Sequence, residues 1–331
     1  MNAKRVDLLN IGLILLSAIL AFQYPIELFL VSFIFIGPLH YFTEINWLDK
    51  KNYFVNGPKR VWLWIGLGAT ILVMIPKFYF FLTTTKSGTF YDGMATFDSW
   101  TNAVYFLSLV AAAGFVWIKK RAYWIALLVP ALAVALLLNS DYTYKSMIGL
   151  FLPTIIHVYL FTLLFMTHGA KKSKSKPGFI AVGLALFIPA IIAGIDIPGD
   201  AFQFSPSVLQ KFEETGLHQL PAQTAQFFGW NDSLVFNING GLELKLMTFI
   251  SFIYLYHYLN WFSKTSLIQW HKSLTWQRSL VIAGTWIFLL TTLYFHFKLG
   301  LVIAIFFSVV HVILEFPLNL ISIKGLFSKE G

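Results

Sequence analysis

The sequence predicts an all-α protein of the polytopic integral membrane class, a bundle of about ten transmembrane helices. Three observations support this prediction. Of the 331 residues, 57% are hydrophobic and only 12% are charged, whereas a soluble domain is about one quarter charged. The apolar residues form long runs that are separated by short clusters of Lys and Arg. Aromatic residues make up 18% of the chain, which also fits helices that meet lipid and its interfaces.

A transmembrane helix needs roughly 20 mostly apolar residues. The first run follows a basic start and has no small-residue cleavage site after it, so we expect a retained span rather than a signal peptide. Prolines at Pro38, Pro76, Pro130, Pro153 and Pro189 lie inside the runs, and some helices should kink there. The candidate spans are 7–23, 26–48, 61–84, 99–118, 122–139, 145–168, 178–196, 243–263, 279–297 and 300–321.

The basic residues predict the orientation of these spans. With the N-terminus in the cytoplasm, most of the 24 Lys and Arg fall at inner ends of the spans. We therefore expect a multi-pass protein of the cell inner (plasma) membrane, with both termini cytoplasmic and the lipid bilayer as its surroundings. The net charge of +9 then reflects topology, and no nucleic-acid partner is predicted. The sequence carries no indication of an oligomeric state.

One segment, residues 197–242, lacks the membrane pattern. It lies between the seventh and eighth spans and carries several acidic residues against the single base Lys211. Because so long a connection is seldom structureless, we predict an extracytoplasmic loop or cap with a short helix near 205–216. It is either an ordinary ordered loop or a lid over a substrate path. Together with the spans it is expected to form a single transmembrane domain, 1–331.

Four histidines fall within predicted spans, where ionisable side chains are costly and usually face the protein interior or a cavity. They are His40, His157, His257 and His311. All four spans run from outside to inside, and at about 1.5 Å per residue the four depths agree within about 8 Å. Scattered structural histidines have no reason to share a depth. We therefore expect the imidazoles to form one layer in the cytoplasmic half of the bilayer.

Two glutamates accompany this layer. Glu44 lies four residues after His40, and Glu315 lies four residues after His311, so each pair shares a helix face. Each carboxylate is either a further metal ligand or the acceptor that fixes the tautomer of a metal-bound histidine. Other polar side chains stand nearby in the sequence, namely Tyr41, Tyr258, Asn46, Asn260 and Asn319.

This set of donors favours a transition metal held by nitrogen and oxygen. The absence of cysteine excludes disulfides, thiolate metal sites, iron–sulfur clusters and cysteine nucleophiles. Iron is the first candidate, in a non-haem or di-metal site of a helix bundle, and copper, zinc and manganese are alternatives. The predicted metal ligands are His40, His157, His257, His311, Glu44 and Glu315. The predicted catalytic groups are Glu44, Glu315, Tyr41 and Tyr258.

A metal among aromatic-rich helices, with no nucleotide-binding motif, indicates oxidation of a lipophilic small-molecule substrate with dioxygen. The hypothesis is thus a non-haem, metal-dependent membrane oxidoreductase or oxygenase. Zinc with an open coordination position would instead indicate hydrolysis within the membrane.

The stretch GPLHYFTE, residues 37–44, has a proline shortly before His40 and an acid, Glu44, four residues after it. In this it resembles the first histidine motif of the Brp/Blh-type membrane β-carotene dioxygenases. That family is polytopic and cleaves a carotenoid with histidine-bound iron, so the resemblance implies an iron oxygenase. The family's paired histidines one helical turn apart are absent here, because His157, His257 and His311 stand singly.

Other functions fit the same residues. A proton- or ion-coupled transporter or channel would use the histidines and glutamates as a relay or a substrate site. A haem-binding protein would use two or four of the imidazoles as axial ligands, although haem iron does not need the glutamates. A non-catalytic subunit of a membrane complex, or polar packing between helices, would need no cofactor.

Overall fold

The computed structural model describes residues 2–51, 60–198, 202–231, 235–238 and 240–327. Every regular element in these ranges is a helix, and eight helical stretches are long and apolar enough to cross a membrane. The prediction of an all-α, polytopic membrane bundle is therefore confirmed. The eight stretches are Ala3–Gln23, Pro25–Lys51, Val61–Leu82, Thr89–Trp117, Tyr142–Ser173, Lys176–Gly194, Trp276–Phe295 and Phe297–Phe327.

The other two predicted spans are helices that do not meet both the length and the hydropathy of a candidate membrane span. Helix α7 (Arg121–Leu138) is apolar but shorter, and helix α13 (Gly241–Ser263) is long enough but is not among the eight. Tyrosines, His257 and Asn260 lower the hydropathy of α13. In α13, 16 of 23 residues are buried, so protein rather than lipid surrounds most of it. A helix enclosed in this way can carry polar groups that a lipid-facing helix cannot.

The chain forms two compact units. Unit 1 contains residues 1–40 and 158–271, and unit 2 contains residues 41–157 and 272–331. Two of the borders fall inside helices, after His40 in α3 (Gly37–Lys51) and after His157 in the π-helix η2 (Ser146–Phe161). The single transmembrane domain expected over 1–331 stays a prediction.

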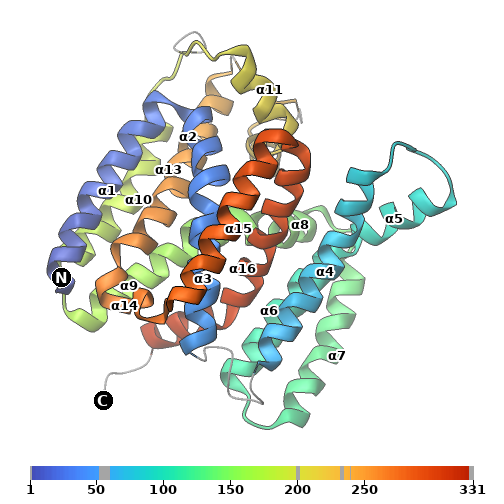
Figure 1. The fold of residues 1–331 in the computed structure, drawn as a ribbon, viewed down its shortest axis with the longest axis horizontal. Helices are drawn as coiled ribbons and strands as arrows, with labels where there is room; N and C mark the ends of the chain where they lie inside the picture. The colour runs from blue at the N-terminus through green and yellow to red at the C-terminus, as the bar shows by residue number, and fades with distance from the viewer. Residues whose placement is uncertain (1, 52–59, 199–201, 232–234, 239, 328–331) are drawn as a thin grey trace. The chain divides into compact units, whose positions relative to one another are not determined.

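Unit 1 is organised around α13. Figure 1 shows α1 (Ala3–Gln23) and α10 (Lys176–Gly194) beside it, and α2 (Pro25–Val31) also packs against it. Polar side chains join these helices, because Asn10 donates to Ser263 Oγ at 2.9 Å and Tyr256 donates to Asn10 Oδ1 at 3.2 Å. The unit also contains η1 (Ser32–Ile36), α9 (Thr162–Ser173), α11 (Pro206–Glu214), α12 (Gln219–Phe227) and α14 (Thr265–Ile268).

Unit 2 is organised around α16 (Phe297–Phe327). Helices α4 (Val61–Leu82), α6 (Thr101–Trp117) and α15 (Trp276–Phe295) pack against it, and α7 pairs with α6. Trp62 of α4 donates its indole N–H to the carbonyl of Leu314 at 3.2 Å. This contact holds α4 beside the turn of α16 that carries His311 and Glu315. The unit also contains α5 (Thr89–Ser99), α8 (Tyr142–Lys145), and the larger parts of α3 and η2. The short helix η3 (Trp270–Ser273) spans the third border between the units, after His271.

Proline accompanies both π-helical segments. Pro153 lies inside η2, and Pro38 is the second residue of α3, which begins directly after η1. A proline has no N–H and crowds the carbonyl four residues earlier, which the wider π turn accommodates. The expected irregularity at these two prolines is therefore seen as a change of helix type, and π turns often occur at functional sites.

The segment 197–242 is partly helical, as expected. Helix α11 confirms the short helix predicted near 205–216, whereas α12 was not predicted. Phe212 of α11 packs edge-on against Phe29 of α2, with ring centroids 6.2 Å apart. Asp200 and Asp232, two of the acids that marked this segment in the sequence, lie outside the described residues. Its extracytoplasmic location stays a prediction.

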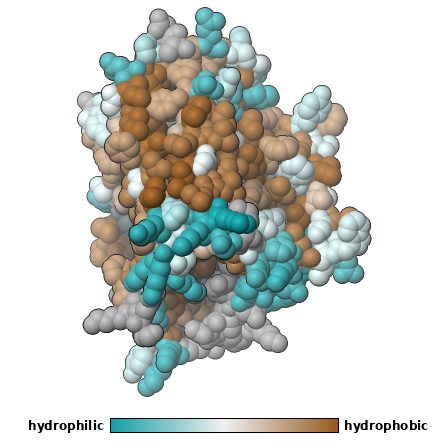
Figure 2. Space-filling model, turned by 90° about the vertical axis from the view of Figure 1, so that its left-hand side faces the viewer, coloured by the Kyte–Doolittle hydropathy of each residue, from teal (hydrophilic) through white to brown (hydrophobic). Residues whose placement is uncertain are grey.

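The surface of unit 1 separates apolar from basic residues. Figure 2 shows the side that carries α1 and α10, where a broad hydrophobic field is bordered below by hydrophilic residues. The start of α10 meets the end of α9 and the start of α1, since a Cβ on Gly178 would lie 2.8 Å from Ala170 Cβ and 3.0 Å from Asp7 Oδ2. Lys4, Arg5 and the lysines of 171–176 therefore gather at one end of the unit, as the predicted topology requires.

Candidate metal centre

Unit 2 brings together four of the residues that the sequence singled out. His157 comes from η2, Glu44 from α3, and His311 and Glu315 from successive turns of α16. The side chains of His157 and His311 are each 2% exposed, that of Glu44 is 3% exposed and that of Glu315 is 12% exposed. Four ionisable groups are thus enclosed in the interior of the unit.

The donor atoms of this cluster lie close to one another. Glu315 Oε2 is 3.2 Å from His157 Nδ1 and 3.9 Å from His311 Nε2. Glu44 Oε2 is 3.2 Å from His311 Nε2. For His157, His311 and Glu315, one donor atom from each lies within 4.8 Å of the other two. Metal bonds of about 2 Å place neighbouring donors about 3 Å apart, so a small inward adjustment of these side chains would accommodate an ion.

The local sequence explains how α16 and η2 present these groups. His311 and Glu315 are four residues apart, so one turn of α-helix stacks them on a single face. His157 lies in the π-helix four residues after Pro153, where the helix departs from the usual α spacing. Its ring meets that of His311 edge to face, with centroids 4.8 Å apart.

The surrounding side chains hold the cluster in place. The ring of Tyr41 stacks on the imidazole of His311, with centroids 5.3 Å apart and planes at 27°. Asn319 follows Glu315 by four residues, so it lies one turn further along the same face of α16. Tyr41, predicted as a catalytic group, and Asn319, noted as a nearby amide, therefore both lie at the cluster.

The two carboxylates of the cluster require a proton or a cation to balance their negative charge. Glu44 Oε2 and Glu315 Oε2 lie 3.2 Å and 3.9 Å from the same nitrogen, His311 Nε2. Two enclosed carboxylates beside one imidazole cannot both remain ionised unless a proton or a cation lies among them. The cluster can therefore hold either a shared proton or a metal ion, which would bind both carboxylates and the two imidazoles.

Unit 1 contains the other two predicted histidines as a pair. His40 Nε2 is 3.1 Å from His257 Nε2, and both side chains are buried. Tyr258, the remaining predicted catalytic residue, lies against His40 with ring centroids 5.1 Å apart. The two nitrogens can share one hydrogen bond, or they can occupy neighbouring ligand positions on a metal.

Thr162 determines which nitrogen of His257 carries the proton. Its hydroxyl donates to the carbonyl of Val158 at 2.8 Å, so its oxygen accepts the Nδ1–H of His257 at 2.8 Å. The Nε2 of His257 therefore presents its lone pair toward His40. This is the arrangement by which an outer hydrogen bond prepares a histidine for metal binding through Nε2. No sequence pattern indicated Thr162.

The predicted set thus falls into two groups, one in each unit. His157, His311, Glu44, Glu315 and Tyr41 lie together in unit 2, whereas His40, His257 and Tyr258 lie together in unit 1. His40 and Glu44 share one face of α3, as their spacing predicted. A single centre formed by all four histidines stays a prediction.

Comparisons of the chain with protein-family models, with curated proteins and with solved structures gave no match. The chemistry of this polytopic membrane-helix protein is therefore inferred from its own residues. What they establish is a buried His/Glu cluster that could bind a metal ion.

Proposed function

We propose that the protein is an integral-membrane metalloenzyme, an oxidoreductase or oxygenase that acts on a lipophilic substrate. His157, His311 and Glu315 are the proposed metal ligands, with Glu44 as a fourth ligand or as the acceptor of the His311 N–H. The observation that carries the proposal is the convergence of two imidazoles and a carboxylate, within 4.8 Å, in the interior of apolar helices.

Iron is the metal we propose. Two histidines and one carboxylate with open positions are the donor set of non-haem Fe(II) oxygenases, and an ion of this kind supplies the activation of dioxygen. The resemblance of residues 37–44 to the Brp/Blh-type dioxygenases supports the same choice. Copper, zinc and manganese are the alternatives that elemental analysis would separate.

The chain's own residues have distinct proposed roles. Burial excludes water from the cluster, and a substrate that dissolves in the bilayer can reach helices that a water-soluble one cannot. The stacked ring of Tyr41 keeps the plane of His311 fixed. Because Glu44 and Glu315 both lie beside His311 Nε2, one proton can be held at the carboxyl oxygens and released when a cation binds.

Further parts of the proposal follow from the sequence. His40 and His257 are proposed as additional ligands, and the Nε2 lone pair of His257 supports this role. We propose the orientation with both termini in the cytoplasm, in which the cluster lies in the cytoplasmic half of an inner membrane. Tyr258 is proposed as a group that contacts the substrate or the reacting oxygen.

Metal content of the full-length protein tests the proposal. We expect stoichiometric iron, or one of the three alternatives, in protein purified in neutral detergent and measured by elemental analysis. His311→Ala and Glu315→Gln should lower the metal content at least several-fold. His296→Ala, which changes an exposed histidine at the end of α15, is the matched control and should retain the wild-type content. Absence of Fe, Cu, Mn and Zn above background from wild-type protein would rule the proposal out.

A proton-coupled transporter is the second candidate, and the observation that favours it is that Glu44 and Glu315 lie 3.2 Å and 3.9 Å from the same nitrogen, His311 Nε2. Two carboxyl groups that share one proton form a unit that can pass it along a pathway. This hypothesis predicts pH-dependent flux in proteoliposomes that Glu315→Gln abolishes, without bound metal. Bound metal together with no flux would eliminate it.

A further inference from the structure

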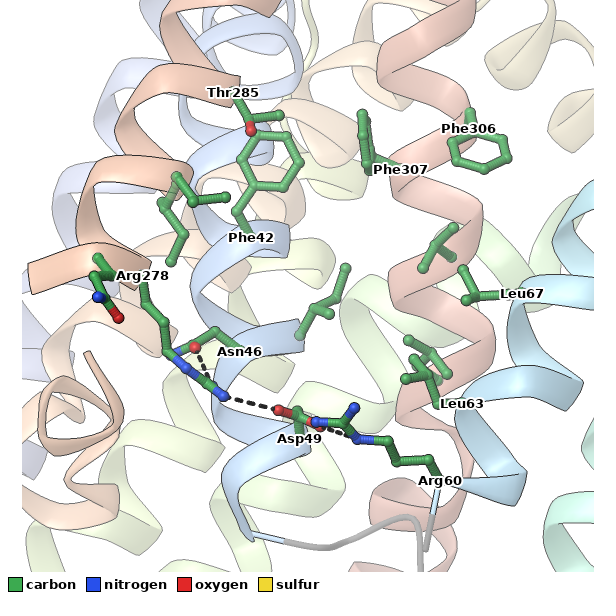
Figure 3. Close-up of a pocket in the computed structure, with 16 residues that line it drawn as sticks. Phe42, Asn46, Asp49, Arg60, Leu63, Leu67, Arg278, Thr285, Phe306 and Phe307 are labelled. Atoms are coloured by element: carbon green, nitrogen blue, oxygen red, sulfur yellow. Dashed lines mark hydrogen bonds and ion pairs between the residues drawn. The ribbon is translucent and has the colours of Figure 1, made fainter. Parts of the chain in front are cut away.

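Unit 2 also contains a pocket between α3, α4, α15 and α16. Its volume is about 570 Å³, and its wall contains none of the six predicted metal ligands. Figure 3 shows aromatic and aliphatic side chains along most of the wall and a charged group at one end. The pocket is therefore amphipathic, with a long apolar part and a short polar part.

The charged end contains two arginines around one acid. Asp49 Oδ2 lies 3.2 Å from Arg278 Nη2, and Asp49 Oδ1 lies 3.5 Å from Arg60 Nε. Arg278 also donates to Asn46 Oδ1 at 2.7 Å. Among the described residues that line the pocket, one carboxylate faces two guanidinium groups, so this end carries a net positive charge. Guanidinium N–H groups are the protein's best donors to carboxylate and phosphate oxygens.

Two helices begin at this same end. Arg60 directly precedes the first residue of α4, and Arg278 is in the first turn of α15. The first N–H groups of a helix carry a partial positive charge, which adds to that of the arginines. Both the side chains and the backbone therefore favour an anion at the polar end.

The backbone of Arg60 points to a role for its side chain. With φ of 71°, Arg60 is in the left-handed region, and its side chain does not cap α4. Asparagine would suit this position better on both counts, because it tolerates the left-handed region and accepts from the first N–H groups of a helix. An arginine here is explained by its guanidinium, which lies beside Asp49 and is 61% exposed.

The apolar part is suited to a hydrocarbon chain. Phe42 and Phe307 meet edge to face with centroids 4.9 Å apart, and Leu67 and Phe306 continue the wall. Val281 at the side of the pocket is 67% exposed. Because α4, α15 and α16 are long and apolar enough to cross a membrane, this exposed side of the pocket can face the bilayer.

We propose that this pocket binds an anionic amphiphile, a molecule with an acyl or similar chain and a carboxylate or phosphate head. Arg278 and Arg60 bind the head, and Phe306, Phe307 and Leu67 line the chain. Membrane helices with a basic pocket at the end of their apolar part recognise anionic lipid head groups by the same chemistry. The proposal is independent of the metal centre, because none of the predicted metal ligands lines the pocket.

Equilibrium binding to full-length, metal-stripped protein in neutral maltoside detergent tests this proposal. Radiolabelled oleate, at an alkaline pH where its carboxyl is ionised, is the probe, and oleyl alcohol is its uncharged counterpart. We expect oleate to bind at least tenfold more tightly than oleyl alcohol. Phosphatidylglycerol and phosphatidylcholine are then tested as competitors. Displacement by phosphatidylglycerol alone identifies a phospholipid as the occupant, whereas no displacement by either identifies a free single-chain acid.

Three variants locate the site. Arg278→Gln and Arg60→Asn should each weaken oleate binding at least tenfold, and Arg60→Asn should do so without lowering the melting temperature, because asparagine suits this backbone. Arg5→Gln, a basic residue of α1 in unit 1, is the matched control and should bind as wild type does. Equal binding of oleate and oleyl alcohol, or unchanged affinity in both pocket variants, would overturn the proposal.

Discussion

The hydroxyl group of Thr162 controls the proton on His257, because its own hydrogen is committed to the carbonyl of Val158. Thr162→Val keeps the shape but removes the acceptor of a buried N–H, which should destabilise the protein by about 1–3 kcal/mol. Thr162→Ser keeps the oxygen and should lose much less. Chemical denaturation in detergent checks this, and equal stability of wild type and Thr162→Val would show that the tautomer is set by another group.

Lys264, just past the end of α13, gives the protein a stability that depends on pH. Burial lowers the pKa of Lys264 from 10.5 to about 7, while the nearby Asp7 acts in the opposite direction. The ammonium group also lies 4.5 Å from the ring centroid of Phe165. The folded state thus binds fewer protons than the unfolded state between pH of about 7 and 10.5. This contribution to stability rises with pH in that window, by about 1.4 kcal/mol per unit.

Lys264→Met should remove this dependence of the unfolding free energy on pH. The variant should be most stabilised relative to wild type near pH 7, and the difference should shrink as pH rises toward 9.5. Unfolding free energies at several pH values measure it, with Lys172→Met, an exposed lysine of α9, as the control. A difference that does not change with pH would show that Lys264 remains charged in the folded protein.

At the residue scale, the sequence predicted the histidines and glutamates better than the residues that hydrogen-bond to them. His311 and Glu315 could be paired from their spacing alone, because one helix carries both. Glu44 and His157 could be recognised as ionisable groups in apolar runs, where a buried charge is costly. Thr162 could not be recognised, since a threonine in an apolar helix usually bonds its own backbone, and only the folded chain places His257 beside it.

At the scale of the helix, two glycines of α4 form a matched pair. A Cβ on Gly66 would lie 2.5 Å from Leu314 Cδ2, whereas a Cβ on Gly68 would meet no atom of the described residues within 4 Å. Both positions gain helix propensity from alanine, by up to about 1 kcal/mol. Gly66→Ala must in addition displace Leu314 between His311 and Glu315, a clash that typically costs about 1–3 kcal/mol.

We therefore expect Gly68→Ala to raise the melting temperature and Gly66→Ala to lower it. Gly66→Ala should also reduce metal retention, because Leu314 lies on the turn that joins the two proposed ligands. Thermal unfolding and elemental analysis of the same preparations measure both effects. Equal behaviour of the two variants would show that α4 does not press on this turn of α16.

The type and burial of the helices were only partly predictable. Apolar run length located most helices, because a span must satisfy its backbone within the helix. It did not distinguish α13, which is enclosed by protein, from helices that face lipid, since both are long and mostly apolar. The π-helical geometry of η2 was not predicted either, although Pro153 indicated that the regular pattern would be disturbed there.

At the scale of the whole molecule, composition determined the class and the polytopic helical fold was confirmed. The packing partners of the helices could not be predicted, because helices surrounded by lipid associate through shape and a few polar contacts rather than through a pattern in one segment. For the same reason, the contact between η2 and α16 that joins His157 to Glu315 had no signature in the sequence.

The charged end of the pocket illustrates the same limit. In the sequence, Arg60 and Arg278 count only among the basic residues that predict topology, and no pattern singles out Asp49. Their mutual contacts, which join α3, α4 and α15, appear only in the folded unit. Charges at the ends of spans can therefore serve both orientation and ligand binding, and spacing along the chain does not separate the two.

X-ray absorption spectroscopy of the metal in the purified full-length protein tests the central claim most directly. We predict a first shell of nitrogen and oxygen only, at about 2.0–2.2 Å, with the outer-shell scattering of at least two imidazoles. His311→Ala should remove one imidazole from that signal or abolish metal binding. A spectrum typical of haem, a first shell without imidazole, or protein that retains no metal would contradict the assignment of His157, His311 and Glu315 as a metal centre.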